Sequence, residues 1–272
     1  MSLGSAVERW AEALACLTVP KEILAAAPEV PWGFPTELFR RRAEAALREA
    51  PTPSHRRSLE ALPEGGVVID VGVGAGAGSL PLAARASLIV GVDSSPAMLE
   101  QFAEAAQAAG ARVEGVVGEW PAVAAQVAEG DVVVCHNVLY NVPDLSPFVE
   151  ALSSHARRRV VVEISEHHPL AWMGDLWERF HGWRRPPGPT AAEAEAALRE
   201  LVEVHSERFT RPVGGGFASR LEAIAMIRRR LCLPAERDDE IVEALEDRLG
   251  LQDGLWFAGT GTWRAVTFWW DR

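Results

Sequence analysis

A run of alternating glycines constrains the fold of this chain more than any other feature. The apolar segment 67–71 leads directly into Val-Gly-Val-Gly-Ala-Gly-Ala-Gly at positions 71–78. Glycine permits positive backbone φ angles and lets a ligand approach the main chain closely. We expect a strand that ends here in a sharp turn, followed by a helix over residues 79–86 whose free N–H groups and positive dipole end face the same place. The pattern therefore predicts a binding site for a cofactor with a polar, adenosine-bearing body.

The rest of the chain alternates between strand-like and helix-like segments. Short apolar runs rich in β-branched residues separate the helical segments, which is typical of a parallel sheet buried on both faces. This alternation predicts an α/β fold, a Rossmann-like doubly wound seven-stranded mixed sheet with an antiparallel strand among the last two. The expected strands are 67–71, 87–92, 112–117, 131–135, 159–164, 204–210 and 263–270, and the helices after them include 96–109, 121–128, 145–153 and 190–202.

Helical segments flank this predicted sheet. We expect residues 1–60 to form an N-terminal helical cap and residues 61–272 to form the cofactor-binding domain, with cap insertions at about 165–189 and 214–250. In the second insertion a run of three glycines at 214–216, expected to be a hinge or a tight turn, precedes two predicted helices, 219–232 and 238–249. The first insertion carries aromatic side chains at helical spacing that either wall a substrate or pack in the core of an inserted helix; we favour the core for Trp172, Trp177, Phe180 and Trp183.

Charge and cysteine content exclude several classes of function. The net charge is −11, and binding to nucleic acid as the main role needs a clustered excess of Lys and Arg that the chain lacks. No apolar run approaches the length that spans a membrane. The three cysteines are far apart and lack metal-ligand spacing, so we expect no metal site and a reduced, cytoplasmic location. The oligomeric state stays open, a homodimer being one possibility.

Asp93 lies 21 residues after Gly72, at the expected end of the second strand. An acid there can accept hydrogen bonds from both hydroxyls of a ribose. The competing interpretation is a helix N-cap, although Ser94 or Ser95 can take that role. The glycines also satisfy the dinucleotide fingerprint Gly-x-Gly-x-x-Ala, so an NAD(P)-dependent oxidoreductase is an alternative. Against it, about 60 residues of mostly helical sequence precede the strand, and the back half shows no acid–base group in obvious context.

Four motifs, taken in order, resemble those of the class I S-adenosylmethionine-dependent methyltransferases, particularly their small-molecule branch (types 11 and 25). The segment 70–76 (Asp-Val-Gly-Val-Gly-Ala-Gly) is similar to the first motif, and 92–99 to the second. The segments 118–121 (Gly-Glu-Trp-Pro) and 136–144 resemble the third and fourth. The resemblance covers roughly residues 60–165. It implies that S-adenosyl-L-methionine is the cofactor and that its contacts include Asp70, Gly72, Gly74, Gly76, Asp93, Ser94, Met98, Glu119, Trp120, His136 and Asn137.

Individual roles follow from the same resemblance. Asp93 is expected to hold the ribose, Met98 to lie near the adenosine and Glu119 to reach the adenine amine. The turn at His136 and Asn137 is expected beside the methionine moiety. The chain departs from the family by lacking Asn/Asp-Pro-Pro-Tyr/Phe after the fourth strand, which disfavours methylation of base or glutamine amino groups.

The chemistry expected of this cofactor is an in-line displacement, so the protein mainly aligns the acceptor and excludes water. Asp70 is expected to help hold the amino group of the cofactor, with a loop-capping carboxylate as the alternative. The acceptor is expected to be an O or N atom of an unidentified small molecule; a catalytically silent S-adenosylmethionine-binding protein is a further alternative. A general base would assist a hydroxyl or protonated amine, and the weak candidates are His167 and His168. Other acids and bases near the strand ends are Glu163, Glu166, His136 and Tyr140, and the expected pocket residues are Tyr140, His168 and Trp172.

Overall fold

A single mixed sheet organises the chain, as the sequence predicts. The computed structural model describes residues 4–33, 36–212, 216–245, 248–258 and 262–272. Strands follow the order β3-β2-β1-β4-β5-β9-β6, and β9 runs antiparallel to both of its neighbours, whereas the first five strands pair in parallel. The strands are β1 (Gly66–Val71), β2 (Ala86–Asp93), β3 (Val113–Val117), β4 (Gly130–His136), β5 (Ala156–Ser165), β6 (His205–Pro212) and β9 (Thr262–Asp271).

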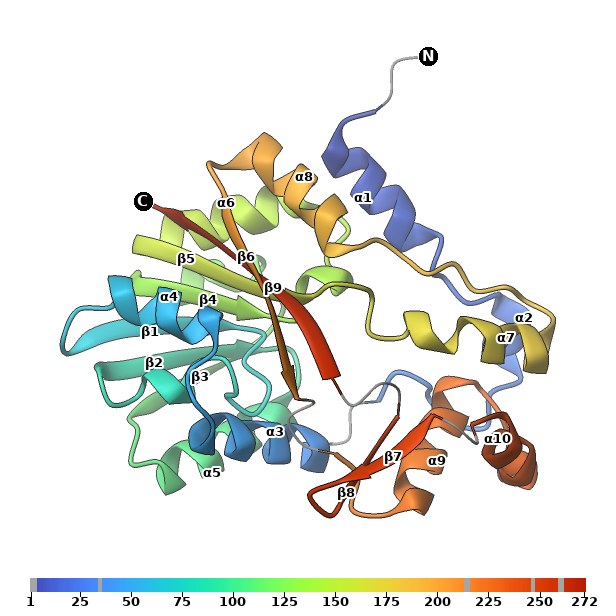
Figure 1. Cartoon of the computed structure of the whole chain (residues 1–272). Helices are drawn as coiled ribbons and strands as arrows, with labels where there is room; N and C mark the ends of the chain where they lie inside the picture. The colour runs from blue at the N-terminus through green and yellow to red at the C-terminus, as the bar shows by residue number, and fades with distance from the viewer. Residues whose placement is uncertain (1–3, 34–35, 213–215, 246–247, 259–261) are drawn as a thin grey trace.

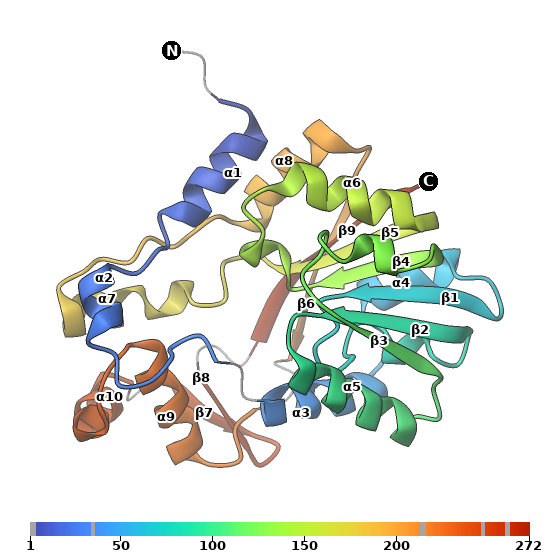
Figure 2. The same cartoon turned by 180° about the vertical axis from the view of Figure 1, so that it is seen from behind.

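Helices cover both faces of the sheet (Figures 1 and 2). On one face lie α6 (Leu145–His155) and α8 (Ala191–Leu201), with α1 (Ala6–Ala15) packed on α8. On the other lie α4 (Pro53–Ala61) and α5 (Pro96–Ala108), and α3 (Thr36–Arg48) packs against α5. This three-layer arrangement confirms the predicted α/β fold class.

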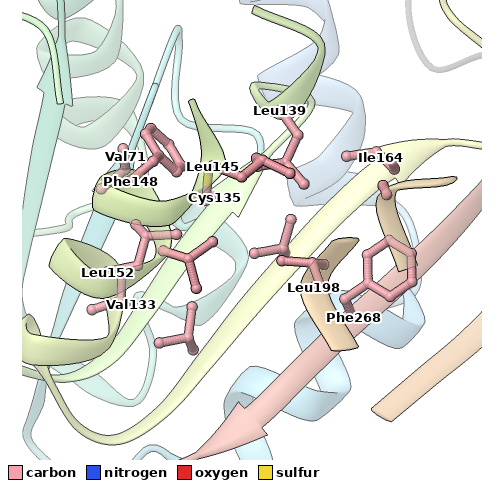
Figure 3. Packing of buried hydrophobic residues seen from close by; sticks show 14 of the residues in the cluster. Val71, Val133, Cys135, Leu139, Leu145, Phe148, Leu152, Ile164, Leu198 and Phe268 are labelled. Atoms are coloured by element: carbon pink, nitrogen blue, oxygen red, sulfur yellow. The ribbon is translucent and has the colours of Figure 1, made fainter. Parts of the chain in front are cut away.

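Successive side chains of the central strands point to opposite faces of the sheet, and apolar side chains point to both faces. On β4, Val133 and Cys135 face α6, while Val132 and Val134 belong to the cluster under α4 and α5, and all four are fully buried. Figure 3 shows the first of these clusters, in which side chains of α6 lie over the strands. A strand whose successive side chains are all buried must be apolar throughout, and this is the pattern that the sequence shows.

A lobe with its own apolar core lies beside the sheet (Figure 1). It contains α2 (Lys21–Ala25), α7 (Gly174–His181), α9 (Arg220–Arg230) and α10 (Asp238–Ala244). Trp177 and Phe180 are buried in this core, and Trp172 and Trp183 pack against it. The aromatic side chains of the first insertion therefore pack in a core, as the favoured interpretation predicted. The two predicted insertions meet in this lobe, although residues 214 and 215 of the expected hinge lie outside the described residues.

The N-terminal helices lie in three places rather than in one cap. Trp10 of α1 is buried in the main core, and α2 belongs to the lobe. The helix α3 packs against α5 and the turn that follows the glycine run, while α4 packs against β5. The boundary at residue 60 stays a prediction, but the segment before it is integrated into the whole molecule.

Three predicted helices differ from the structure. The helix expected at 79–86 is only a 3₁₀ turn, Leu80–Leu82, because β2 begins at Ala86 and leaves no room for a longer helix. The helix expected at 121–128 is likewise a 3₁₀ turn. The helix expected at 238–249 ends at Ala244, and β7 (Leu249–Gln252) then pairs with β8 (Leu255–Ala258) in a hairpin. Its turn residues Asp253 and Gly254 both have positive φ, so the Asp-Gly pair was the signal for this hairpin.

Among the helices that the structure describes, none has the length and apolar character needed to cross a lipid bilayer.

Candidate functional site

The glycine run forms a tight turn at the carboxyl end of β1. Gly72, Gly74 and Gly76 have φ angles of +74°, +52° and +93°. The N–H groups of Gly72 and Val73 donate to the carbonyl of Val92 at 2.8 and 3.0 Å, which ties the turn to β2. A Cβ atom at Gly72 would lie 2.3 Å from Val138 Cγ2, so this glycine is required by packing as well as by its φ angle. The turn is therefore fixed before any ligand binds.

Asp93 lies at the end of β2, beside this turn. Its Oδ2 atom accepts a hydrogen bond from the N–H of Gly74, and its Oδ1 atom accepts one from the N–H of Ser95, both at 2.9 Å. Ser95 is the N-cap of α5 and accepts from the N–H of Met98, so Asp93 does not cap the helix. The side chain of Ser94 is exposed and that of Met98 is buried. The carboxylate of Asp93 is thus oriented by two backbone donors and keeps lone pairs for a ligand.

A cavity of about 110 Å³ opens beside the glycine turn. Typical ligand pockets measure roughly 300–1,000 Å³, so this cavity can enclose one end of a cofactor but not all of it. The structure brings five of the predicted contact residues to its wall, namely Asp70, Gly72, Gly74, His136 and Asn137. The other predicted contacts do not line it. Among them, Glu119 is exposed, and Trp120 is buried edge-on against His155, with ring centroids 4.9 Å apart.

Asp70 is the most buried acid of the cavity, with 1 % of its surface exposed. The pKa of its carboxyl is raised to about 7, mainly by burial; Ser79 lowers the pKa and the neighbouring Asp93 raises it, and the value of about 7 includes both effects. Its Oδ2 atom accepts no hydrogen bond from the residues that the structure describes. A Cβ atom at Gly78 would lie 3.4 Å from this oxygen and 3.0 Å from His136 Nδ1, so the glycine leaves the two polar groups uncovered. Such an acid can accept hydrogen bonds from an ammonium group.

Two histidines meet at the cavity, and the sequence predicted only His136. The second, His55 of α4, lies with its ring centroid 5.9 Å from that of His136. Its Nδ1 accepts from the N–H of Thr52 at 3.2 Å, so Nε2 carries the proton and donates to the carbonyl of Ala77 at 3.1 Å. Burial lowers the pKa of His55 to about 4 and also lowers that of His136. Both rings are therefore neutral near pH 7.

An ion pair between a buried glutamate and a half-buried arginine lines the cavity. Glu163 of β5, 2 % exposed, accepts from Ser54 Oγ at 2.6 Å and from an Nη atom of Arg211 at 3.2 Å. Burial alone would raise the pKa of Glu163, but the guanidinium of Arg211 and the hydrogen bond from Ser54 lower it. Glu163 was one of the acids considered as a general base. Here it is an ionised carboxylate held by its neighbours, which makes it a poor proton acceptor.

Helix α3 supplies the cover of the cavity. Phe39 lies over the glycine turn, where a Cβ atom at Gly74 would lie 3.4 Å from Phe39 Cδ1. The guanidinium of Arg42 lies 5.4 Å from the centroid of the Phe39 ring, and both side chains line the cavity. The cavity also contains four residues that the sequence did not predict, namely Phe39, Arg42, His55 and Arg211. Only Arg211 had a usable signal, because it directly follows the sixth predicted strand and the carboxyl ends of parallel strands share one edge.

The predicted base candidates lie away from this cavity. His167 is exposed and forms a β-bridge with Thr190. His168 accepts from the N–H of Leu170 at 3.1 Å, and its ring lies edge-on to that of Tyr140 at 5.2 Å. Neither histidine lines the cavity, since the chain turns toward the lobe directly after β5.

The predicted pocket residues also lie elsewhere. Tyr140 is buried, and its hydroxyl donates to the carbonyl of Ser165 at 2.8 Å. Burial raises the pKa of this phenol above its usual value, so Tyr140 stays protonated near pH 7 and is not available as a general base. Trp172 packs against the core of the lobe. The pocket expected from Tyr140, His168 and Trp172 is therefore not part of the cavity beside the glycine turn.

Among the described residues, no group of three or more His, Cys, Asp or Glu side chains is arranged to hold a metal ion.

Comparison with known proteins identifies the domain around this site. Residues 68–159 match the family profile of a methyltransferase domain. The YcgJ protein from Bacillus subtilis has a similar structure, with 18 % identity, a TM-score of 0.50, and coverage of 80 % of this chain and 99 % of that chain. A cyclopropane-fatty-acyl-phospholipid synthase-like protein from Lactobacillus casei has 14 % identity and a TM-score of 0.53, covering 92 % of this chain and 97 % of that chain. At these identities the likeness shows the fold alone. A search of curated proteins finds no match.

Proposed function

We propose that this chain, in which residues 68–159 match a methyltransferase domain, is a class I methyltransferase that uses S-adenosylmethionine to methylate an oxygen or nitrogen atom of a small molecule. The observation that carries the proposal is the joint placement of the glycine turn and Asp93. An adenosine-bearing ligand needs close contact with the backbone and an acid beside its ribose. The glycine turn and Asp93 can supply these, and a hydrogen bond from the N–H of Gly74 to Asp93 joins them directly.

The residues around the turn fit the cofactor. The uncovered Oδ2 atom of Asp70 suits its ammonium group, and the free lone pairs of Asp93 suit the ribose hydroxyls. Gly74 leaves room for its body because nothing but Phe39 lies within 4 Å of a Cβ atom built there. Ser94, Met98, Glu119, Trp120 and Gly76 lie outside the cavity, and their roles toward the adenosine stay predictions.

When bound, the sulfonium of the cofactor supplies an activated methyl group. The chain's own residues then have to position the acceptor and exclude water. Phe39 of α3 covers the turn, and the Glu163–Arg211 pair lines the same cavity. A general base needs a free lone pair and a pKa near 7. Among the described cavity residues only Asp70 has both, and Asp70 faces the expected position of the ammonium group. We therefore propose that the acceptor reaches the site already able to act as a nucleophile, or loses its proton to water.

The net charge, the absence of one motif and the size of the cavity indicate which class of molecule accepts the methyl group. Nucleic acid is disfavoured because the net charge is −11 and the chain lacks the motif for methylation of base amino groups. The small enclosed volume favours a small molecule.

Turnover distinguishes an enzyme from a silent binder. The protein with S-adenosylmethionine is screened against small molecules that carry hydroxyl or amine groups, and release of S-adenosylhomocysteine is followed. We expect at least one acceptor that gives turnover, reduced by Asp93→Asn. Tight binding of S-adenosylmethionine without turnover across the library would instead support a catalytically silent cofactor-binding protein.

A further inference from the structure

We propose that Arg185 and His168 bind an anionic group of the methyl acceptor, a carboxylate, at a place outside the cofactor cavity. The inference rests on the proposed function and adds the substrate class to it. Its basis is a buried guanidinium that has no acceptor among the described residues and does not line the cavity beside the glycine turn.

Arg185 is a buried cation without a partner in the described part of the chain. Only 5 % of its surface is exposed, and its Nε and Nη1 atoms are buried without an acceptor. Arg230, the other buried arginine among the described residues, instead donates to the carbonyl of Pro31 at 2.8 Å. Burial lowers the pKa of Arg185 to about 10, so the group stays charged near pH 7. A buried donor without an acceptor costs free energy that an anionic ligand can offset.

His168 supplies a second donor beside Arg185. Its Nδ1 atom accepts from the N–H of Leu170 at 3.1 Å, so Nε2 carries the proton in the neutral ring. Burial and the nearby charge of Arg185 lower the pKa of His168 to about 4, which keeps the ring neutral near pH 7. The side chain of His168 is half-buried, so a ligand can reach the two donors from solvent.

The connection between α7 and α8, residues 182–190, holds Arg185 beside His168. It runs from the lobe back to the sheet (Figure 1). A Cβ atom at Gly188, where φ is +79°, would lie 3.2 Å from His168 Cβ and 3.0 Å from Leu17 Cδ1, so the glycine lets the connection pack closely on both. The carbonyl oxygen of Arg185 lies 3.5 Å from a Cβ atom built at Gly174, at the start of α7. Packing therefore fixes the backbone on which the guanidinium stands.

The two donors lie beside the cofactor cavity, toward the other face of the sheet. Neither Arg185 nor His168 is among the described residues that line this cavity, which α3 and α4 wall on their side. The ring of His168 instead meets that of Tyr140 edge-on, and Tyr140 belongs to the core under α6 and α8. Tyr140 lies three residues after Asn137, which lines the cavity. An acceptor held by the two donors is thus next to the cofactor without occupying the place of its amino-acid end.

The charge of the two donors indicates a monoanion. Arg185 carries one positive charge, and the neutral His168 adds a donor without a charge. A carboxylate carries one negative charge and matches the planar fork of a guanidinium in two hydrogen bonds. A phosphate monoester carries up to two negative charges, which would leave one of them uncompensated beside a buried group. The donors therefore fit a carboxylate better.

Binding of small acids to the protein saturated with S-adenosylhomocysteine tests the inference. The probes are benzoate, phenylacetate and propionate, each compared with its uncharged amide, and binding is followed by calorimetry. We expect at least one acid to bind the wild type and its amide to bind far more weakly. Arg185→Met should weaken that acid about tenfold or more, since a charge-assisted pair is lost. Arg184→Met, at the exposed neighbouring position, is the matched control and should leave the affinity unchanged.

Thermal unfolding separates a binding role from a structural one. Without a ligand, Arg185→Met should unfold at the same temperature as the wild type or at a higher one, because it removes an unpaired buried charge. A bound acid should raise the unfolding temperature of the wild type but not that of Arg185→Met. Arg185→Lys keeps the charge without the planar fork and should retain part of the affinity. If Arg185→Met unfolds at a lower temperature and still binds the acids as the wild type does, Arg185 is structural.

Two cofactor fragments test whether the carboxylate is the cofactor's own. S-adenosylhomocysteine carries the amino-acid group, and 5′-methylthioadenosine lacks it. We expect Arg185→Met to leave both affinities unchanged. A loss for S-adenosylhomocysteine alone would show that Arg185 binds the cofactor, and the inference would be wrong. It is equally wrong if no acid binds the wild type, or if the acids bind Arg185→Met equally well. Failure of the wild type to bind S-adenosylhomocysteine would instead overturn the proposed function.

Discussion

The carboxylate of Asp93 accepts a hydrogen bond from the backbone N–H of Gly74 at 2.9 Å. This contact joins the acid at the end of β2 to the middle of the glycine turn at the end of β1. Because the second carboxylate oxygen accepts from the N–H of Ser95, both oxygens have fixed positions before a ligand arrives. A ribose that binds Asp93 is thereby placed against the one glycine of the turn that faces open space apart from Phe39.

Asp93→Asn should weaken S-adenosylhomocysteine binding roughly tenfold to a hundredfold, because a charged acceptor of the ribose hydroxyls is replaced by a neutral amide. Calorimetry measures the change. Asp131→Asn is the control, since Asp131 also accepts from a backbone N–H, that of Val67 at 2.9 Å, but at the start of the strands. Equal affinities of Asp93→Asn and wild type would refute the ribose role.

Gly74→Ala should weaken cofactor binding at least about tenfold, because its Cβ would occupy the surface against which the ligand lies. Gly110→Ala separates this effect from backbone strain. Gly110 has a φ of +66° and nothing within 4 Å of a built Cβ atom, so both variants carry a left-handed backbone cost of about 1–2 kcal/mol. Similar unfolding midpoints with different affinities are expected. Unchanged affinity in Gly74→Ala would show that the ligand does not lie there.

The buried Asp70 should make cofactor affinity depend on pH. The pKa of its carboxyl is about 7, raised mainly by burial, and only the carboxylate attracts an ammonium group. Affinity for S-adenosylhomocysteine should therefore rise between pH 6 and 8. In Asp70→Asn the affinity should be lower and its rise with pH smaller. Calorimetry at three pH values tests this, and identical pH profiles in the two proteins would contradict it.

The same carboxyl should reduce the stability of the unliganded protein as the pH rises. Its pKa is higher in the folded than in the unfolded state, so the folded state binds more protons between about pH 4 and 7. The favourable contribution of the protonated form is therefore lost as the pH rises through 7. Asp70→Asn should then be more stable than wild type at pH 8 and nearly equal at pH 4. Urea unfolding at both values measures the difference, and a destabilised variant at pH 8 would count against it.

Removal of Glu163 should destabilise the protein because it leaves the half-buried Arg211 without its anion. Glu163→Gln is expected to lower the free energy of unfolding by roughly 2–4 kcal/mol. Adding Arg211→Met should restore part of that loss, since no unpaired charge then remains. Glu207→Gln, which breaks a half-exposed pair with Arg57, should cost less than about 1 kcal/mol. A double variant less stable than Glu163→Gln would show that the ion pair is not the cause.

The sheet could be predicted well because a strand buried on both faces is apolar along its whole length. The segment 131–135, for example, is apolar between Gly130 and His136, and it forms the central part of β4. Local signals were also sufficient for the glycine turn and the acid that follows it. Longer helices were predicted where the structure has only short 3₁₀ turns, at Leu80 and Ala124. Helix propensity is a local property and does not indicate how few residues remain before the next strand begins.

The remainder of the site could not be predicted because it is assembled by tertiary packing. Arg42 lies on an amphipathic helix in which three consecutive arginines look alike in sequence, and only packing shows which of them faces the cavity. His55 lies in a capping box, and nothing in its neighbourhood marks it as a cavity residue. His167 and His168 follow β5 and seemed well placed, but the chain turns toward the lobe at that point.

Calorimetric titration of the full chain with S-adenosylhomocysteine and, separately, with NAD⁺ tests the central claim most directly. S-adenosylhomocysteine should bind with a dissociation constant in the micromolar range, about −8 kcal/mol, and NAD⁺ should give no measurable heat of binding. Binding of NAD⁺ at micromolar concentration without binding of S-adenosylhomocysteine would contradict the account.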